Sequence, residues 1–339
     1  MKKESRLFSV PYNNEEPTDY INKVILPYKN NIENVFFAPI FLCISHQSGL
    51  RKDLRFYDNN TFETLKQKEE YSYEFLKISK GLIKRIITVN AGHYNMTTDE
   101  IKAFIISSLV PLIENYDVEG FICTDFSMAC YLHNLYPKLE LHTSCNCMQW
   151  NIRQMKIWQE EAGISIFNPP REILRTPEKL KEMHNAGFKI KALVNESCLY
   201  GCPRTINHMV DLAIGSNQTA FMCNRGELIN FFKCNWVIPR WLPLLDKYVD
   251  IYKIAGRRIS TNQIAHILKS YIELNDNVDI LSLVIGQPRQ EMKKYYGSIP
   301  CKFIPDKLLT CECKECNTNC KCCEKIMKKL NIRRTIATH

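Results

Sequence analysis

The chain has 339 residues, and its 45% hydrophobic fraction, with 16 Tyr and 16 Phe, suffices for a sizeable core. This composition excludes a disordered protein except at the ends, and the net charge of +9 permits an RNA partner or an anionic substrate without indicating either. No long apolar segment follows Met1–Arg6, and nothing approaches the roughly 20 apolar residues of a membrane span. We therefore expect a cytoplasmic protein without a membrane partner.

Apolar runs with strand character alternate along the chain with helical patterns. After an irregular lead-in over residues 1–30, we predict eight strands, at Val35–Cys43, Ile83–Asn90, Val118–Cys123, Leu139–Thr143, Ile164–Phe167, Phe188–Val194, Asn235–Ile238 and Val249–Ile254. Amphipathic helices are predicted between several of them, such as Pro177–Ala186 and Thr98–Tyr116, which opens on the helix-start signal Thr97-Thr98-Asp99-Glu100. Short buried strands that alternate with helices predict a parallel sheet, and eight of them favour a closed, TIM-type (β/α) barrel of the α/β class.

The predicted barrel occupies residues 31–300, and a helix over Gln263–Leu274 is expected to pack on it. Residues 301–339 form a separate cysteine-rich module that ends in a basic segment, with a short helix at Lys325–Leu330. The chain therefore reads as a lead-in, one large barrel and a small C-terminal appendage.

Sixteen cysteines in a chain with no export signal argue against disulfides, because the cytosol keeps thiols reduced. Cys198 and Cys202 follow the predicted strand Phe188–Val194, and Cys223 and Cys234 lie further on. Four thiolates suit an iron–sulfur cluster or a tetrahedral zinc ion. Structural cysteines that line a core are the alternative.

The tail places six cysteines within thirteen residues. Such a density predicts a metal site, with candidate ligands at Cys311, Cys313, Cys316, Cys320 and Cys323 and with Cys322 lying among them. Zinc and a second iron–sulfur cluster are both compatible with these ligands.

Polar residues recur at the ends of the predicted strands. The candidates for a catalytic site are Asp125, His142, Asn195, Glu196, Lys253 and Arg257. Each alone could be a capping or turn residue, but catalytic groups of such barrels come from strand ends and the loops after them. Their recurrence predicts a polar pocket for an oxygen-rich or anionic ligand, with positive charge from Lys253 and Arg257. The hydrolase and nucleotide motifs HExxH, GxSxG and the Walker loop are absent from the sequence.

Several segments resemble the motifs of one family. Residues 117–125 (DVEGFICTD) are similar to its GxDGxIVxD strand, residues 139–146 (LELHTSCN) to LPIHASTQxN, residues 161–164 (EAGI) to the segment that follows, and residues 252–257 (YKIAGR) to FKIEGR. Together with the cysteines after Asn195-Glu196, they make the chain resemble the collagenase-like peptidase family of the unassigned catalytic class, the peptidase U family. The resemblance runs from about Phe36 to Leu274.

That family includes iron–sulfur proteins that hydroxylate tRNA, ribosomal RNA or the ubiquinone ring without molecular oxygen, some with prephenate as oxygen donor. The resemblance implies a barrel with a 4Fe–4S cluster, whose ligands by position would be Cys198, Cys202, Cys223 and Cys234. It implies an oxygen-independent hydroxylase or related redox enzyme, which acts on a small or RNA-borne substrate with an electron donor as partner. The chain departs from the family in the close spacing of Cys198 and Cys202, where the usual motif ExFVHGALC has wider spacing, and in its cysteine-rich tail.

Two other hypotheses stay open. A peptidase needs a nucleophile and a base, for which Cys145 with His142 is the best available pair, although the two residues are three apart along a strand. A non-catalytic metalloprotein would bind RNA or a protein partner through its basic tail, because zinc knuckles bind single-stranded RNA.

Overall fold

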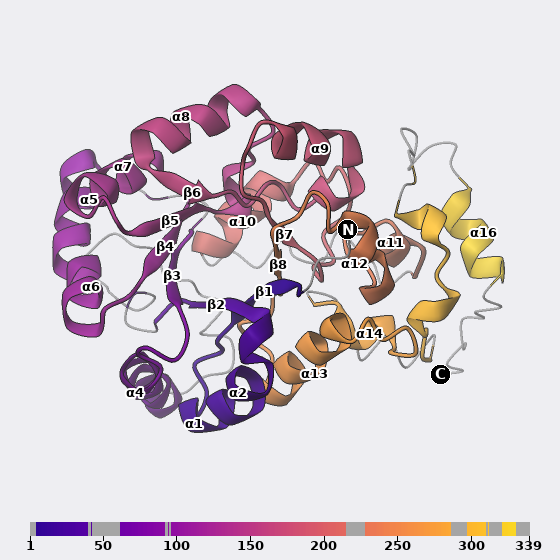
Figure 1. The fold of residues 1–339 in the computed structure, drawn as a ribbon, viewed down its shortest axis with the longest axis horizontal. Helices are drawn as coiled ribbons and strands as arrows, with labels where there is room; N and C mark the ends of the chain where they lie inside the picture. Colours follow the sequence, from indigo (N-terminus) through magenta and orange to yellow (C-terminus); the bar gives the residue numbers. More distant parts are fainter. Residues whose placement is uncertain are drawn as a thin grey trace.

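The computed structural model describes residues 5–39, 42, 62–91, 94, 96–214, 228–285, 297–309, 311 and 321–329. A ring of parallel strands lies at its centre and helices surround the ring (Figure 1). None of the helices in these ranges combines the length and the apolarity that a bilayer crossing requires. Four of the cysteines, Cys223, Cys313, Cys316 and Cys320, lie outside the described residues.

Eight strands form one sheet in the order β6-β5-β4-β3-β2-β1-β8-β7, and each pair within it is parallel. Their bounds are β1 Leu7–Pro11, β2 Ile32–Phe37, β3 Arg85–Val89, β4 Gly120–Cys123, β5 Glu140–Thr143, β6 Ile164–Ile166, β7 Lys191–Leu193 and β8 Ile251–Lys253. The two ends of this order meet just past β6, where Phe167 N donates to Lys189 O (2.9 Å) and Lys191 N donates to Phe167 O (2.8 Å). The sheet is therefore a barrel of the TIM type, as the alternation of apolar runs and helical patterns predicted.

Helices connect the strands and cover the outside of the ring (Figure 1). They are α1 Pro17–Tyr20, α2 Leu26–Tyr28, α4 Phe62–Ile78, α5 Thr98–Phe104, α6 Val110–Tyr116, α7 Phe126–Leu135, α8 Ile152–Ala162, α9 Pro177–Asn185, α10 Thr205–Ile214, α11 Leu228–Phe232, α12 Leu242–Leu245, α13 Thr261–Ile272, α14 Ile280–Leu283 and α16 Cys322–Lys329. A π-helical turn, Ile105–Leu109, joins α5 to α6. The predicted helix start is confirmed, because Thr97 and Glu100 form a reciprocal capping box at α5.

One predicted strand is wrong, and one strand of the structure was not predicted. The lead-in was predicted to be irregular, which is wrong for β1, since its Ser9 pairs with β2 on one side and β8 on the other. The strand predicted at Asn235–Ile238 is also wrong, because this segment bonds to the end of β7 through Val237 N and Val194 O (2.9 Å) without joining the sheet. Trp236 instead stacks between Phe231 and Trp241, and an apolar run buried against aromatic rings has the same sequence pattern as a buried strand.

The interior of the barrel carries charge as well as apolar side chains. Glu140 and His142 share one face of β5, two residues apart, while Leu141 between them joins the core under the helices. Lys191 of β7 reaches the same interior and contacts His142. A small apolar cluster of Phe36, Ile86 and Ile122, separate from the main core, fills the inside of the neighbouring strands. The interior therefore combines charged side chains from β5 and β7 with an apolar cluster from β2 to β4.

The C-terminal segments pack on the barrel side near the loops after β7. Cys301 is fully buried, and Arg240 donates to its carbonyl oxygen (2.8 Å). Cys323 of α16 is buried in the main core cluster, and α16 contacts α11 (Figure 1). The described residues from Cys301 onward therefore include side chains that pack into the core of the barrel, so this part is not a fully separate module.

Candidate active site

Loops at the carboxyl ends of the strands bring together a polar group centred on Arg171, in the loop after β6. Its Nε donates to Glu196 Oε2 (2.5 Å), from the loop after β7. Its Nη2 donates to Asn146 Oδ1 (2.8 Å), from the loop after β5, and contacts Met209 Sδ at 3.2 Å. Asn146 in turn donates to Asn90 O (3.2 Å), just past β3. These contacts fix four loops at the barrel face where enzymes of this fold carry their active sites.

Arg171 is a functional candidate that the sequence did not reveal. Only 7% of this residue is exposed, and its Nη1 has no hydrogen-bond partner within the described residues. Burial opposes its charge, but the neighbouring Cys145, Glu196 and Cys198 raise the pKa of Arg171, so the guanidinium remains a cation. Its only signal in the sequence is a charged residue directly after Asn168-Pro169-Pro170 at the end of a predicted strand.

Lys253 ends β8 and adds a second buried cation to this face. Only 6% of it is exposed, and its Nζ lies 4.3 Å from the centre of the Phe36 ring. The pKa of Lys253 is lowered to about 8, and burial is the largest cause. Arg257, in the loop after β8, donates from Nη1 to Thr88 Oγ1 of β3 (2.7 Å). Of the predicted site residues, the structure thus places Glu196, Lys253 and Arg257 at the barrel mouth.

His142 lies in the barrel interior instead. It is fully buried, its Nε2 lies 2.6 Å from Glu140 Oε1, and its Nδ1 lies 2.5 Å from Lys191 Nζ. With both ring nitrogens engaged, His142 is not paired with Cys145, and the nucleophile–base pair considered for a peptidase does not form. The side chain that looked like a strand-end residue belongs to the middle of the barrel.

Two more predicted residues have structural roles. Asn195 is fully buried, donates to Ala255 O (3.2 Å) and Leu283 O (3.1 Å), and accepts from Ala255 N (2.7 Å). It therefore ties the loop after β7 to the segments after β8. Asp125 caps α7 by accepting from Met128 N (2.8 Å). The structure does not bring either side chain into the group around Arg171.

The loop cysteines lie beside this group. The segments that carry Cys198 and Cys234 run antiparallel, with Asn235 N donating to Cys198 O (2.9 Å) and Tyr200 N donating to Lys233 O (2.9 Å). Burial raises the pKa of the Cys198 thiol, and both Glu196 and Cys234 are near enough to raise it further. Cys202 follows on a turn in which its N–H donates to Leu199 O (3.3 Å).

The donor set agrees in chemistry with a thiolate-bound metal or cluster. Cys198 and Cys234 would supply two of the four predicted ligands from facing segments. In the part of the chain that is described, no three His, Cys, Asp or Glu side chains converge on one point. Cys198, Cys202 and Cys234 are all described and do not form such a group, and Cys223 lies outside the described residues. The predicted metal site of the tail is also only partly described. Of its predicted ligands, the structure describes the partly exposed Cys311 and the buried Cys323.

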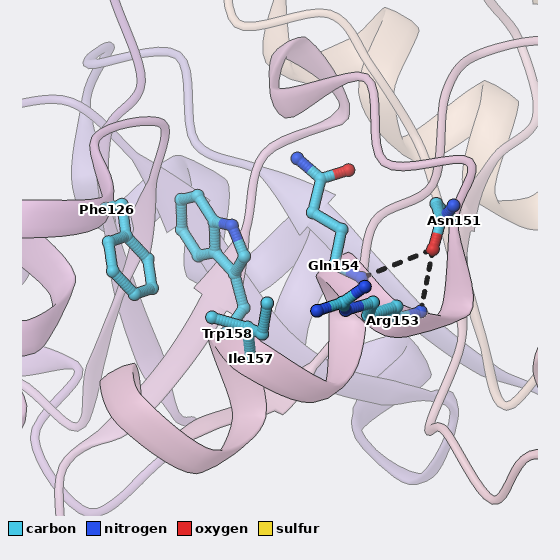
Figure 2. A pocket seen from close by; sticks show the side chains of 6 residues that line it. All are labelled: Phe126, Asn151, Arg153, Gln154, Ile157 and Trp158. Atoms are coloured by element: carbon cyan, nitrogen blue, oxygen red, sulfur yellow. Dashed lines mark hydrogen bonds between the residues drawn. The ribbon is translucent and has the colours of Figure 1, made fainter.

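A separate shallow hollow lies on the outside of the barrel, between the starts of α7 and α8 (Figure 2). It is lined by Phe126, Asn151, Arg153, Gln154, Ile157 and Trp158. Asn151 Oδ1 accepts from the backbone of Arg153 (2.8 Å) and Gln154 (3.4 Å), as a helix cap does. These N–H groups at the start of α8 are therefore already satisfied, and the hollow carries no chemistry of its own.

The fold and this mouth define an α/β barrel protein with a cationic, thiol-containing site at the carboxyl ends of its strands. The family model of peptidase family U32 matches residues 51–199. An uncharacterized protease of Methanocaldococcus jannaschii, MJ1657, is 26% identical over 211 residues, which are 56% of this chain and 61% of that protein. The solved structure of the U32 peptidase Mk0906 aligns with a TM-score of 0.50 at 9% identity, covers 76% of this chain and 96% of that one, and supports the fold alone. These matches support the resemblance of the chain to the collagenase-like peptidase family U32.

Proposed function

We propose that this protein is an iron–sulfur-dependent, oxygen-independent hydroxylase or a related redox enzyme, which acts on a small or RNA-borne substrate at the barrel mouth. The observation that carries the proposal is that Cys198 and Cys234 lie on facing segments beside the Arg171–Glu196 pair. Thiol ligands and a charged, largely buried site therefore share one face of the barrel. An electron donor would be the partner of such an enzyme.

The residues that would hold the cluster are Cys198, Cys202, Cys223 and Cys234. When bound, a cubane with four cysteine ligands supplies electron transfer, because no iron is left with an open position. We also propose that the tail cysteines bind a second metal, zinc or a further cluster, as their density predicts.

The protein's own side chains would position and protonate the substrate. Asn146 and Glu196 hold Arg171 from two sides, so its guanidinium is fixed in orientation before a ligand arrives. Lys253 has a pKa of about 8, so it is mostly protonated at neutral pH. Because this pKa is close to neutral pH, the ammonium could donate a proton to a nearby oxygen more readily than an ordinary lysine. Positioning by Arg171 and proton transfer by Lys253 are thus the roles that we propose.

Anaerobic isolation tests the proposal. The absorbance spectrum, iron and acid-labile sulfide should be measured for the unmodified protein, for Cys198→Ser and Cys234→Ser, and for Cys130→Ser as the matched control. Cys130 is a partly exposed thiol on α7, away from the loop cysteines. We expect iron and sulfide in the unmodified and control proteins and a loss of most of both in the other two. A colourless protein that contains only zinc contradicts the proposal.

The peptidase alternative rests on the names of the two relatives, protease and peptidase, and on Cys145. This thiol lies close enough to Arg171 and Lys253 to influence both cations, and thiols beside cations can serve as nucleophiles. Hydrolysis of casein or gelatin that is abolished by Cys145→Ser and kept by Cys130→Ser would favour a peptidase. Because His142 is held by Glu140 and Lys191, we expect no such hydrolysis.

A further inference from the structure

The guanidinium of Arg171 is held at two of its three nitrogens and left open at the third. Glu196 takes Nε and Asn146 takes Nη2, while Nη1 is buried without a partner among the described residues. In the loop after β5, Gln149 likewise has both of its amide atoms buried and unpaired within those residues. Two neighbouring loops at the barrel mouth therefore carry buried polar groups that lack a protein partner.

An unpaired buried donor is costly. Leaving such a group without an acceptor costs free energy, more so when the group is charged, and native proteins rarely leave one without a reason. Here the donor is fixed in place by its neighbours, so it cannot turn away to find water without breaking its contact with Glu196 or Asn146. An acceptor atom supplied by a ligand would remove the cost.

The charges around Arg171 indicate the sign of that ligand. Lys253 is a second buried cation, close enough for the two positive charges to affect each other, and its ammonium makes no hydrogen bond to any described residue. Glu196 is the carboxylate that faces them. With one carboxylate against two cations, and with Arg257 nearby on Thr88, the site has an excess of positive charge that an anion would balance.

We propose that Arg171 and Lys253 bind the carboxylate group of a small-molecule ligand at the barrel mouth. The oxygens of that carboxylate would accept hydrogen bonds from Arg171 Nη1 and from Lys253 Nζ. The inference rests on the proposed function only in treating the ligand as a substrate or co-substrate, and as a binding site it stands alone.

A carboxylate fits these loops better than a phosphate. Phosphate sites are commonly built from glycine-rich loops whose successive backbone N–H groups, or the start of a helix, surround the anion. The loops that carry Asn146 and Arg171, residues 144–151 and 167–176, contain no glycine. The second loop also holds Pro169 and Pro170, and both lack the N–H that such a loop would use. Recognition here depends on side-chain cations, which suit a planar carboxylate.

The competing explanation is that Arg171 only interacts with Cys145 and Cys198, which act on the same guanidinium. In that case a carboxylate would have no preference for the site, and replacement of Arg171 would change thiol or metal chemistry but not carboxylate binding. The two explanations therefore predict different outcomes for one binding measurement.

Calorimetric titration of the anaerobically isolated full chain distinguishes them, with benzoate as the carboxylate probe, benzamide as its neutral counterpart and inorganic phosphate as the alternative anion. We expect benzoate to bind at least about tenfold more tightly than benzamide or phosphate. Arg171→Gln should weaken benzoate binding at least about tenfold. Arg153→Gln, which replaces an exposed arginine on α8, should leave it unchanged. Equal binding of benzoate and benzamide, a preference for phosphate, or an unaltered Arg171→Gln variant overturns the proposal.

A second variant protects the test against a folding defect. Arg171→Gln removes contacts between loops, so its thermal unfolding must be compared with that of the unmodified protein. If this variant is not folded, Lys253→Met replaces it as the test. We expect Lys253→Met to bind benzoate at least about fivefold more weakly, and unchanged binding would contradict the proposal. Iron measured on the same samples separates this inference from the proposed function. Benzoate binding by an iron-free protein would support the carboxylate site and contradict the proposed iron–sulfur function. An iron-loaded protein that does not bind benzoate would contradict the carboxylate site and support the proposed function.

Discussion

The imidazole of His142 should make the protein less stable as the pH falls below neutrality. Burial is the main cause, and the neighbouring Lys191 adds to it, so that together they lower the pKa of His142 to about 3, from the ordinary 6.5, against the opposing effect of Glu140. Burial also lowers the pKa of Lys191 itself well below its ordinary value. Lys253 also lowers the pKa of His142 from the barrel mouth. The ring is therefore neutral in the folded protein at pH values where the unfolded chain would protonate it.

The sign and size follow from proton linkage. Between pH values of about 6.5 and 3 the unfolded state binds a proton that the folded state does not, so stability decreases as the pH falls through this range. With these two pKa values, His142 alone should remove roughly 2 kcal/mol of unfolding free energy between about pH 7.5 and about pH 5. Most carboxylates titrate below this interval, which is why it isolates histidine.

Urea unfolding at several pH values in this interval measures the effect. His142→Gln keeps a neutral side chain between Glu140 and Lys191, so it should remove roughly 2 kcal/mol from the pH dependence whatever its stability near neutrality. His184→Gln, on the partly exposed side of α9, leaves His142 in place and should keep the pH dependence of the unmodified protein. If His142→Gln retains the full dependence, the buried neutral imidazole is not its source and the reasoning is refuted.

Two further predictions concern the barrel wall. Gly120→Ala should destabilise the protein by about 3 kcal/mol in urea unfolding, because the added Cβ would lie 2.1 Å from the backbone oxygen of Glu140 on the neighbouring strand; a loss below about 1 kcal/mol would show that β4 and β5 can separate easily. Glu119→Ala should lower the free energy of unfolding by about 2 kcal/mol. The Glu119 carboxylate accepts from Arg85 Nη2 (2.9 Å) and Nε (3.1 Å), and without it the fully buried guanidinium keeps only the carbonyl groups of Leu76 and Asp117 as acceptors. A neutral outcome would mean that water replaces Glu119, whose side chain is 35% exposed.

The barrel could be predicted because its strands are short, apolar and separated by helices with clear start signals. The capping box at Thr97 and the runs that became β3 to β5 are local features, and local features can be read from sequence. The strand β1 was missed because Leu7–Pro11 is brief and lies among turn residues, and only its pairing with β2 and β8, far away in the sequence, makes it a strand.

The location of the site could be predicted from the sequence, but the residues that form it could be predicted only in part. Lys253 ends β8 and Glu196 follows β7, so both lie where strand ends meet, as expected. His142 was assigned to the mouth because position along a strand does not reveal how deep in the barrel a side chain lies, and its partners Glu140 and Lys191 come from the fold. Arg171 lies five residues past β6 and matches no motif, so only its long-range contacts with Asn146 and Glu196 identify it.

The central claim is that the loop cysteines, rather than the tail, hold iron beside the cationic mouth. Deletion of the tail would confuse the test, because Cys301 and Cys323 are part of the core. Iron per chain should instead be measured after anaerobic isolation in two full-length variants: Cys198→Ser with Cys234→Ser, and Cys313→Ser with Cys316→Ser and Cys320→Ser. The account predicts that the first variant loses the iron of the loop site and that the second retains it. Iron that persists in the first variant and disappears from the second would contradict the account.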